Sequence, residues 1–457
     1  MPDIELVASA PLKVGLCHLP TLSLTQTFTV FTADLRFIPE AAQLYMRLVN
    51  ADDCRRNVRF EVRLGVWVGS VLGRVMAAWE SFLLELPADT PRALVEIQIR
   101  VFDEDCELEQ SLRSADPLPS LVLQSHEGAP CSAVVWISTV LPPRARALQF
   151  LSSTASYDYL GWMIGCTTTA LALLDVAALE VRLSGVGEGL PLIGGTAFQL
   201  APADEGNIAQ LESFAPFAAL ATLPAASRGQ LEQTAPQLLA LCQAELPQYT
   251  SEGCFTIAYP LVCLADRLEQ PAWFAAAQVA VLRRWEVLVR GSEIAQRGRA
   301  DGSQVWMENW ARGTAWLLLG TALVADKLPE QQRRVLIKKL VSVIPTLLER
   351  QLGNGLWSVF THRADTGAES SGSAGIAAAL AIAAKRKWLT ADLEQRALTA
   401  AQACAAALDG CVEADGCLGL VSQHNPAAEQ ALQIGYRMRA AWGTGLYAIL
   451  LWALATN

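Results

Sequence analysis

The chain contains little charge for its size. Asp, Glu, Lys and Arg together make up 18% of its 457 residues, whereas soluble domains average about 25%. Hydrophobic residues make up 52%, enough to offset the entropy of ordering, which excludes an intrinsically disordered protein. A length of 457 residues is sufficient for two or three domains.

Long apolar runs are missing as well. The uncharged, apolar-leaning stretch between Asp158 and Asp175 is interrupted by Gly, Cys and Thr. A membrane-spanning helix needs about 18 or more apolar residues, and the runs 375–384 and 440–455 are shorter or interrupted. The hydrophobic residues are therefore expected to fill large buried cores, and no membrane partner is expected.

Positive charge is scarce. The net charge is −10, and the longest basic block is Lys385-Arg386-Lys387. Nucleic acids and anionic membranes bind surfaces where Lys and Arg cluster, so neither is expected as a partner. The sequence leaves open whether the protein forms a homo-oligomer.

The 11 cysteines form no metal-binding pattern. The sequence contains no Cys-x-x-Cys and no Cys/His group at zinc spacing, so we expect buried, reduced cysteines and no metal. A Gly-rich phosphate loop is also missing, and no cofactor is expected. Residues 1–5 lack the basic start of a signal peptide, which favours a cytoplasmic location.

The first 200 residues contain short runs typical of β-strands. Leu94–Phe102 alternates between apolar and polar residues almost strictly, which is typical of a half-buried strand. Turn-forming residues separate the runs, and several short strands at this spacing indicate an antiparallel sandwich. We therefore predict an N-terminal antiparallel β-sandwich over residues 1–200, with 150–200 left unassigned. The predicted strands are 27–32, 59–63, 82–86, 94–102 and 133–140.

From about residue 205 the apolar period becomes that of helices. Ala and Leu dominate, which suits helix interiors, and Gly-rich connections separate the helices. Successive helix pairs favour a toroid or solenoid of helix pairs over residues 205–457. Nine helices are too few for a twelve-helix ring, so either residues 150–200 add helices or the ring is incomplete. The nine predicted helices are 207–222, 228–246, 254–268, 271–290, 307–326, 330–351, 370–387, 391–408 and 437–454.

The segment Asp301–Trp316 carries residues suited to sugar binding. We expect it to open a helix on which Glu308 and Arg312, four residues apart, can form an ion pair. Trp faces stack on sugar rings, and Arg can clamp a carboxylate. The alternative is a core helix whose tryptophans only pack. The tryptophans are Trp306, Trp310 and Trp316.

Two later segments offer further candidates. Glu369 and Ser370, just before a helix, can contact a ligand or simply cap the helix amides. Tyr436 opens the last helix and can face a toroid mouth or pack. His362 is more typical of a surface loop than of a catalyst.

Three sequence elements, in this order, resemble those of the unsaturated uronyl hydrolases of glycoside hydrolase families 105 and 88. They are W-A-R-G-T-A-W at 310–316, G-L-W at 355–357 and E-S-S-G-S-A at 369–374. The resemblance covers residues 250–457 and implies an (α/α)6 toroid. It also implies metal-free hydrolysis of the oligosaccharides that polysaccharide lyases produce.

The resemblance further implies a mechanism and a catalytic residue. In these families an Asp general acid protonates the C4=C5 bond of a terminal unsaturated uronic acid, water adds at C5, and the resulting hemiketal falls apart. The position that matches this Asp is Glu252, whose side chain is one methylene longer. The family's His has no counterpart in residues 293–298.

We therefore expect a hydrolase of short uronic-acid oligosaccharides with Glu252 as its acid. Arg312 would clamp the uronate and tryptophans would form the sugar platforms. Two alternatives remain: a non-catalytic carbohydrate-binding or scaffolding protein with a degenerate toroid, and an assembly partner that uses its β domain as an interface. The predicted substrate-binding residues are Trp306, Trp310, Arg312, Trp316, Trp357, Glu369, Ser370 and Tyr436.

Overall fold

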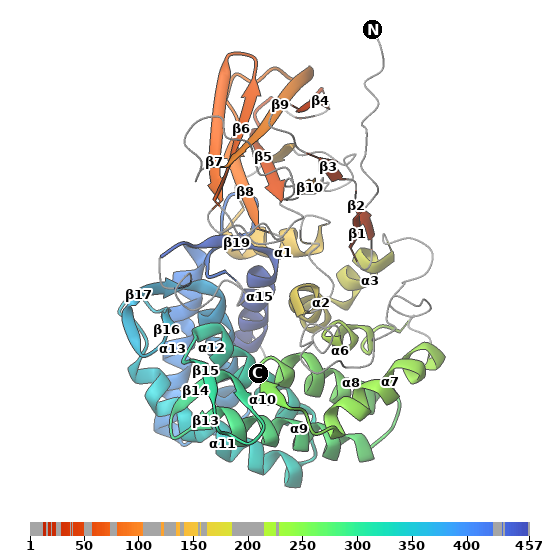
Figure 1. Cartoon of the computed structure of the whole chain (residues 1–457), viewed down its shortest axis with the longest axis vertical. Coiled ribbons are helices and arrows are strands. Elements are labelled where there is room, and N and C mark those ends of the chain that lie inside the picture. Colours follow the sequence, from red (N-terminus) through yellow and green to blue (C-terminus); the bar gives the residue numbers. More distant parts are fainter. Residues whose placement is uncertain are drawn as a thin grey trace.

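A computed structural model describes residues 228–423 without interruption. It also describes residues 214–224, 432 and 435–455 and, with internal gaps, residues 12–184. The strands of the N-terminal part and the helices that follow occupy opposite ends of the molecule (Figure 1). The predicted change from strands to helices along the chain is therefore confirmed.

The N-terminal strands pair in antiparallel fashion. A four-stranded sheet has the order β4-β9-β6-β7, and β11, β5 and β8 pair in that order in a second sheet. The alternation predicted for 94–102 is confirmed, because Val95, Ile97, Ile99 and Val101 are buried in β9. One apolar core takes side chains from both sheets. The antiparallel sheets are thus confirmed, and the sandwich stays a prediction.

The strands of this part are β1 (Leu12–Val14), β2 (Cys17–Leu19), β3 (Thr21–Ser23), β4 (Thr29–Asp34), β5 (Gln43–Val49), β6 (Val58–Leu64), β7 (Trp67–Gly73), β8 (Ser81–Glu85), β9 (Leu94–Asp103), β10 (Ser120–Val122) and β11 (Val134–Ile137).

Residues 143–184 form the helices α1 (Pro143–Ser152), α2 (Trp162–Leu174) and α3 (Val176–Ser184). The helix α2 includes three consecutive threonines, Thr167–Thr169, a residue type that is more common in strands. Thr167 and Thr168 lie in α2 and donate their hydroxyls to the carbonyl of Ile164, at 3.0 and 2.8 Å. This local bonding makes threonine acceptable in a buried helix.

The remaining helices agree with the predicted ones, with three differences in their division or start. Residues 254–268 divide into a short π-helical segment, η4, and α8. The helix α10 begins at Ala311 rather than at residue 307, and α15 begins at Ala441 rather than at residue 437, because a strand precedes each of them. Tyr436 therefore does not open the last helix, as predicted, but lies before β19. Of the first predicted helix, 207–222, the described residues contain only α6. The helices are α6 (Phe217–Leu220), α7 (Arg228–Gln243), η4 (Cys254–Ala258), α8 (Tyr259–Arg267), α9 (Ala272–Leu288), α10 (Ala311–Lys327), α11 (Glu330–Glu349), α12 (Ser370–Lys385), α13 (Ala391–Asp409) and α15 (Ala441–Ala455).

The helices form two layers. Residues 311–325 of α10 are buried on every face, whereas α11 buries only one stripe, which includes Leu336, Leu340 and Leu347. In the described residues, contacts between inner helices run from α8 to α10, α12, α15, α2, α6 and back to α8. The ring therefore closes through α2, which answers the question that the nine predicted helices left open. The domain boundary near residue 200 stays a prediction, although α2 lies before it and packs in the ring.

Glycines let the inner helices approach closely. A Cβ atom on Gly320 would lie 2.5 Å from the main chain of Cys254, and one on Gly372 would lie 2.5 Å from that of Ala311. Such distances leave no room for a side chain. None of the helices in the described ranges is long and apolar enough to cross a membrane.

Short strands lie between the helices, and several of them lead directly into inner helices: β12 into η4, β15 into α10, β17 into α12 and β19 into α15. The side chains of these strands therefore lie near the N-terminal ends of the inner helices. These strands are β12 (Gln248–Thr250), β13 (Val289–Arg290), β14 (Glu293–Arg299), β15 (Val305–Glu308), β16 (Trp357–Phe360), β17 (Arg363–Glu369), β18 (Leu418–Val421) and β19 (Met438–Ala440).

The strands β18 and β19 extend the second N-terminal sheet. Arg439 of β19 pairs with Ser81 of β8, which gives the five-stranded order β11-β5-β8-β19-β18. The two parts of the molecule therefore share one sheet.

Candidate functional site

Glu252 lies in the turn between β12 and η4 and is buried. The side-chain amide of Gln296 donates to its Oε1 at 2.6 Å, and its Oε2 has no hydrogen-bond partner among the described residues. Burial raises the pKa of this carboxyl, against the opposing effects of the Gln296 hydrogen bond and the charges of Arg297 and Arg312. Glu252 therefore keeps its proton to a higher pH than an ordinary Glu.

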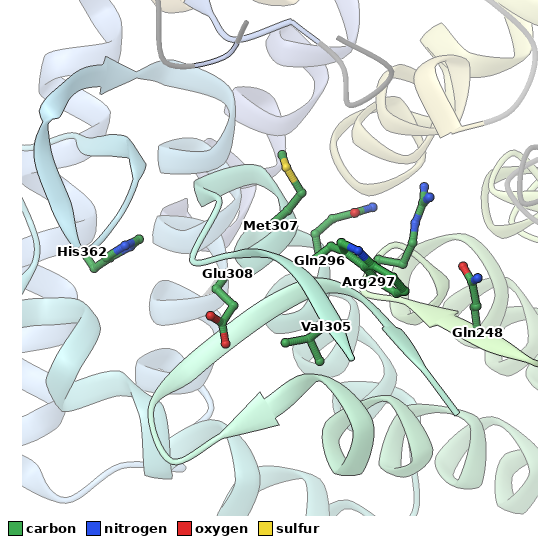
Figure 2. Close-up of a pocket in the computed structure, with 8 residues that line it drawn as sticks. Gln248, Gln296, Arg297, Val305, Met307, Glu308 and His362 are labelled. Carbon is green, nitrogen blue, oxygen red and sulfur yellow. The ribbon is translucent and has the colours of Figure 1, made fainter. Parts of the chain in front are cut away.

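A cleft of about 550 Å³ is linked to this carboxyl through Gln296, and Glu252 itself is not among the residues that line it. Its walls come from β12, β14 and β15, and His362 projects from the β16–β17 hairpin (Figure 2). Gln296 belongs both to this wall and to the hydrogen bond with Glu252. The lining residues are Gln248, Gln296, Arg297, Val305, Trp306, Met307, Glu308 and His362.

Arg297 and Trp306 form a cross-strand pair in this wall. They lie directly opposite each other in the antiparallel register of β14 and β15, so their side chains leave the same face of the ladder. A cation beside an aromatic ring suits a ligand that combines an anionic group with a ring face.

The backbone of the wall is held in an uncommon conformation. Met307 and Asn309 have φ angles of 56° and 60°, the left-handed region that non-glycine residues rarely adopt. The side-chain oxygen of Asn309 accepts from the amide of Ile294 at 3.1 Å and from Arg350 at 3.2 Å. Arg350 also pairs with Glu293 at 2.6 Å. This network stabilises a strained segment that forms one side of the cleft.

Arg312 lies in the first turn of α10 with 1% of its surface exposed. It donates to the carbonyl and hydroxyl oxygens of Ser422, at 2.7 and 3.0 Å, and to the carbonyl of Gln423. Its guanidinium lies 4.4 Å from the ring centre of Trp310 and 4.4 Å from that of Trp442. Burial lowers its pKa to about 10, against the charges of Glu369 and Glu252.

The predicted ion pair between Glu308 and Arg312 is wrong. Glu308 belongs to β15 and lines the cleft, whereas Arg312 belongs to α10. The helical spacing of four residues does not apply across the junction of a strand and a helix.

Glu369 is the N-cap of α12 and has no exposed surface. Its carboxylate accepts from the amides of Ser371, at 2.9 Å, Gly372, at 2.5 Å, and Ser422, at 3.1 Å. Ser370 donates its hydroxyl to the carbonyl of Gly419 at 2.7 Å. The capping alternative accounts for the contacts of Glu369.

The other predicted side chains are also engaged within the protein. The indole nitrogen of Trp357 donates to the carbonyl of Leu347 at 2.8 Å. Trp316 packs 5.2 Å from the ring centre of Phe255, and the hydroxyl of Tyr436 donates to Glu80. Of the eight predicted substrate-binding residues, only Trp306 lines the cleft.

Sequence reasoning missed Gln296 and Arg297. Both fall in the stretch 293–298, which lacks the histidine of the families that the chain resembles. They line the same cleft although they are neighbours on β14. Strand alternation, which places neighbours on opposite faces, therefore does not identify them.

Comparisons with known proteins give the same classification for the C-terminal half. Residues 291–456 match the family model of Glycosyl Hydrolase Family 88, which confirms the resemblance inferred from the motifs. A comparison with curated proteins finds no match.

Several solved structures share the fold. A family 105 glycoside hydrolase of C. acetobutylicum has a TM-score of 0.57 and 14% identity, over 69% of this chain and 100% of that one. A possible member of family 105 from Klebsiella pneumoniae has a TM-score of 0.53 and 16% identity, over 68% and 91%. An unsaturated glucuronyl hydrolase specific for heparin has a TM-score of 0.52 and 12% identity, over 68% and 96%. These likenesses establish the helical toroid.

Proposed function

We propose, from the match of residues 291–456 to glycoside hydrolase family 88, that the protein hydrolyses short oligosaccharides ending in an unsaturated uronic acid. The observation that carries the proposal is Glu252, a buried carboxyl with a raised pKa and one oxygen free of hydrogen bonds among the described residues. It occupies the position that matches the family's general acid. The similar fold of an unsaturated glucuronyl hydrolase supports the substrate class.

In the proposed reaction Glu252 gives its proton to C4 of the C4=C5 bond, while Gln296 holds the other carboxylate oxygen. Water then forms a bond to C5, and its released proton restores the acid. The product at C5 is a hemiketal, and its opening breaks the glycosidic bond and releases the remaining sugar. The net change is the addition of one water molecule.

Arg297 replaces Arg312 as the proposed partner of the uronate carboxylate. The donors of Arg312 are directed to Ser422 and Gln423, whereas Arg297 lines the cleft opposite Trp306. A protein of net charge −10 needs a local cation to bind an anionic sugar, and Arg297 supplies it beside an aromatic ring.

A second candidate function is non-catalytic saccharide binding in the same cleft. Two observations favour it. Glu252 stands at the position where the family has an Asp, and Arg312 is buried with its donors bonded to carbonyl groups of the protein itself. Because a Glu side chain is one methylene longer than that of Asp, its proton is displaced by about 1 Å, and such a displacement can lower the rate about 100-fold.

One experiment separates the two functions. The protein is incubated with a panel of unsaturated uronyl disaccharides, and the loss of absorbance of the conjugated double bond is followed. Glu252→Gln is expected to lower the rate by about 100-fold or more, and Glu286→Gln, on the exposed face of α9, keeps it. Calorimetric binding without any loss of absorbance would favour the binding protein, and neither signal across the panel would contradict both.

A further inference from the structure

Glu80 is a buried charged residue that the proposed reaction does not use. It directly precedes β8 in the N-terminal part and has no exposed surface. Its carboxylate accepts from the hydroxyl of Tyr436 and, at 3.4 Å, from the side-chain amide of Gln423. Tyr436 and Gln423 belong to the C-terminal part of the chain, so Glu80 joins the two parts.

The segment Ser422–Gln423 has contacts on its other side as well. The carbonyls of both residues accept from Arg312, and the amide of Ser422 donates to Glu369 at 3.1 Å. A short piece of main chain after β18 therefore lies between a carboxylate of the N-terminal part and the Arg312 cluster, which comprises Arg312, Trp310 and Trp442.

The main chain next to Glu80 is itself fixed. Ser81 pairs with Arg439 in the shared sheet, and β18, which ends directly before Ser422, pairs with β19. Since Glu80 directly precedes one strand of this sheet and Gln423 lies two residues after another, the sheet restricts the distance between them. A carboxylate held in this way fixes the side chain of Gln423 and limits the motion of its carbonyl.

We infer that Glu80 is a positioning residue for the Arg312 cluster. Through Gln423 it fixes the carbonyl groups that orient the Arg312 guanidinium between the rings of Trp310 and Trp442. The charge of Glu252 in turn acts on Arg312 and favours its charged form. The N-terminal part thus contributes to the order of the candidate site although it supplies no residue to the cleft among those described. The inference does not require the proposed reaction.

Hydrogen exchange tests this role in the full-length protein. Glu80→Ala is expected to raise the exchange rate of the amides of residues 421–423 by tenfold or more. Glu80→Gln is expected to restore most of the protection. The oxygen of the new amide still accepts from Tyr436, and Gln423 can rotate its side-chain amide so that its oxygen accepts from the new N–H group. Tyr436→Phe, which removes a single hydroxyl, gives an intermediate increase and serves if Glu80→Ala does not fold.

Arg47→Met is the matched control. Arg47 is a buried residue of β5 that bonds Asp415 at 3.0 Å, so its loss weakens the same interface without touching Gln423. Fluorine spectra of 5-fluorotryptophan-labelled protein supply the second measurement. The signals of Trp310 and Trp442, assigned by Trp310→Phe and Trp442→Phe, are expected to shift in Glu80→Ala and not in Arg47→Met. Unchanged exchange in Glu80→Ala, or equal effects in both variants, would overturn the inference.

Discussion

Glu252 combines burial with incomplete hydrogen bonding, and both affect its proton. The folded protein disfavours the charged form, so the pKa lies above its ordinary value. In the unfolded chain the same group ionises near pH 4.5. Between these two values the folded state holds a proton that the unfolded state has lost, so stability falls as pH rises.

Glu252→Gln removes this titration. The free energy of unfolding of the unmodified protein is expected to fall relative to that of the variant as pH rises above 4.5, by about 1.4 kcal/mol per pH unit until the raised pKa is passed. Below pH 4.5 the difference stays constant. Urea unfolding of both proteins at a series of pH values measures this difference. Free energies of unfolding that change in parallel with pH would contradict a raised pKa of Glu252.

Sequence reasoning found individual residues more readily than it found their partners. Glu252 and Trp306 were identifiable from motifs, and six of the seven described cysteines without disulfides are buried as expected. The occupation of Arg312 by Ser422 and Gln423 was not predictable, because these residues lie far along the chain and their carbonyls carry no sequence signal.

At the scale of helices, the sequence predicted which segments are helical better than how they begin. Thr390 and Glu369 both occupy N-cap positions, but the Thr390 side chain makes no capping hydrogen bond, whereas Glu369 accepts from two amides of its own helix. The start of α10 was placed too early because the tryptophan spacing of 306–316 fits a helix as well as a strand followed by a helix.

The two caps are therefore expected to differ in strength. Glu369→Ala leaves three buried amides without an acceptor and is expected to lower the free energy of unfolding by about 2–4 kcal/mol. Thr390→Ala is expected to cost less than about 0.5 kcal/mol. Chemical denaturation compares them, and equal losses would show that the Glu369 cap is not stabilising.

Close helix contacts give another prediction at this scale. Gly320→Ala would push a methyl group to within 2.5 Å of the Cys254 main chain and is expected to lower the free energy of unfolding by about 1–3 kcal/mol. Gly353→Ala, at a site with no atom within 4 Å, is expected to leave stability unchanged or slightly higher. A thermal denaturation experiment in which both variants melt alike would contradict tight α10–η4 packing.

At the scale of the whole molecule, two features could not be predicted from the sequence pattern. The ring closes through α2, whose three threonines resemble a strand until the buried environment is known. The sheet that joins the two parts also depends on a pairing between β8 and β19. Both require contacts between segments far apart along the chain, which local periodicity does not report.

A buried ion cluster stabilises the same junction. Asp415 pairs with Arg47 of β5 and with Arg439 of β19. Although burial raises the pKa of Asp415, Arg439 and Arg47 hold it well below its ordinary value of 3.8. Since the folded pKa is depressed, the stabilisation is present above pH 3.8 and is lost as pH falls towards the depressed value.

Asp415→Asn removes the carboxylate that the buried Arg47 and Arg439 share, while Arg439 keeps its pair with Glu413 at 2.8 Å. The loss is expected to lower the free energy of unfolding by about 3–5 kcal/mol at pH 7. Asp365→Asn, which removes an exposed pair with Arg363, serves as the control and is expected to leave stability unchanged. The difference between unmodified and Asp415→Asn protein should shrink on acidification. A constant difference down to pH 2 would contradict the ionised cluster.

The pairing of β8 with β19 has a consequence for synthesis. Ser81 leaves the ribosome more than 350 residues before its partner Arg439. The edge of β8 that receives β19 therefore stays without this partner while the intervening residues are synthesised, and an open strand edge invites intermolecular pairing. Domain-by-domain folding during synthesis can complete neither part, so this protein is expected to fold late, with a need for protection of that edge by chaperones.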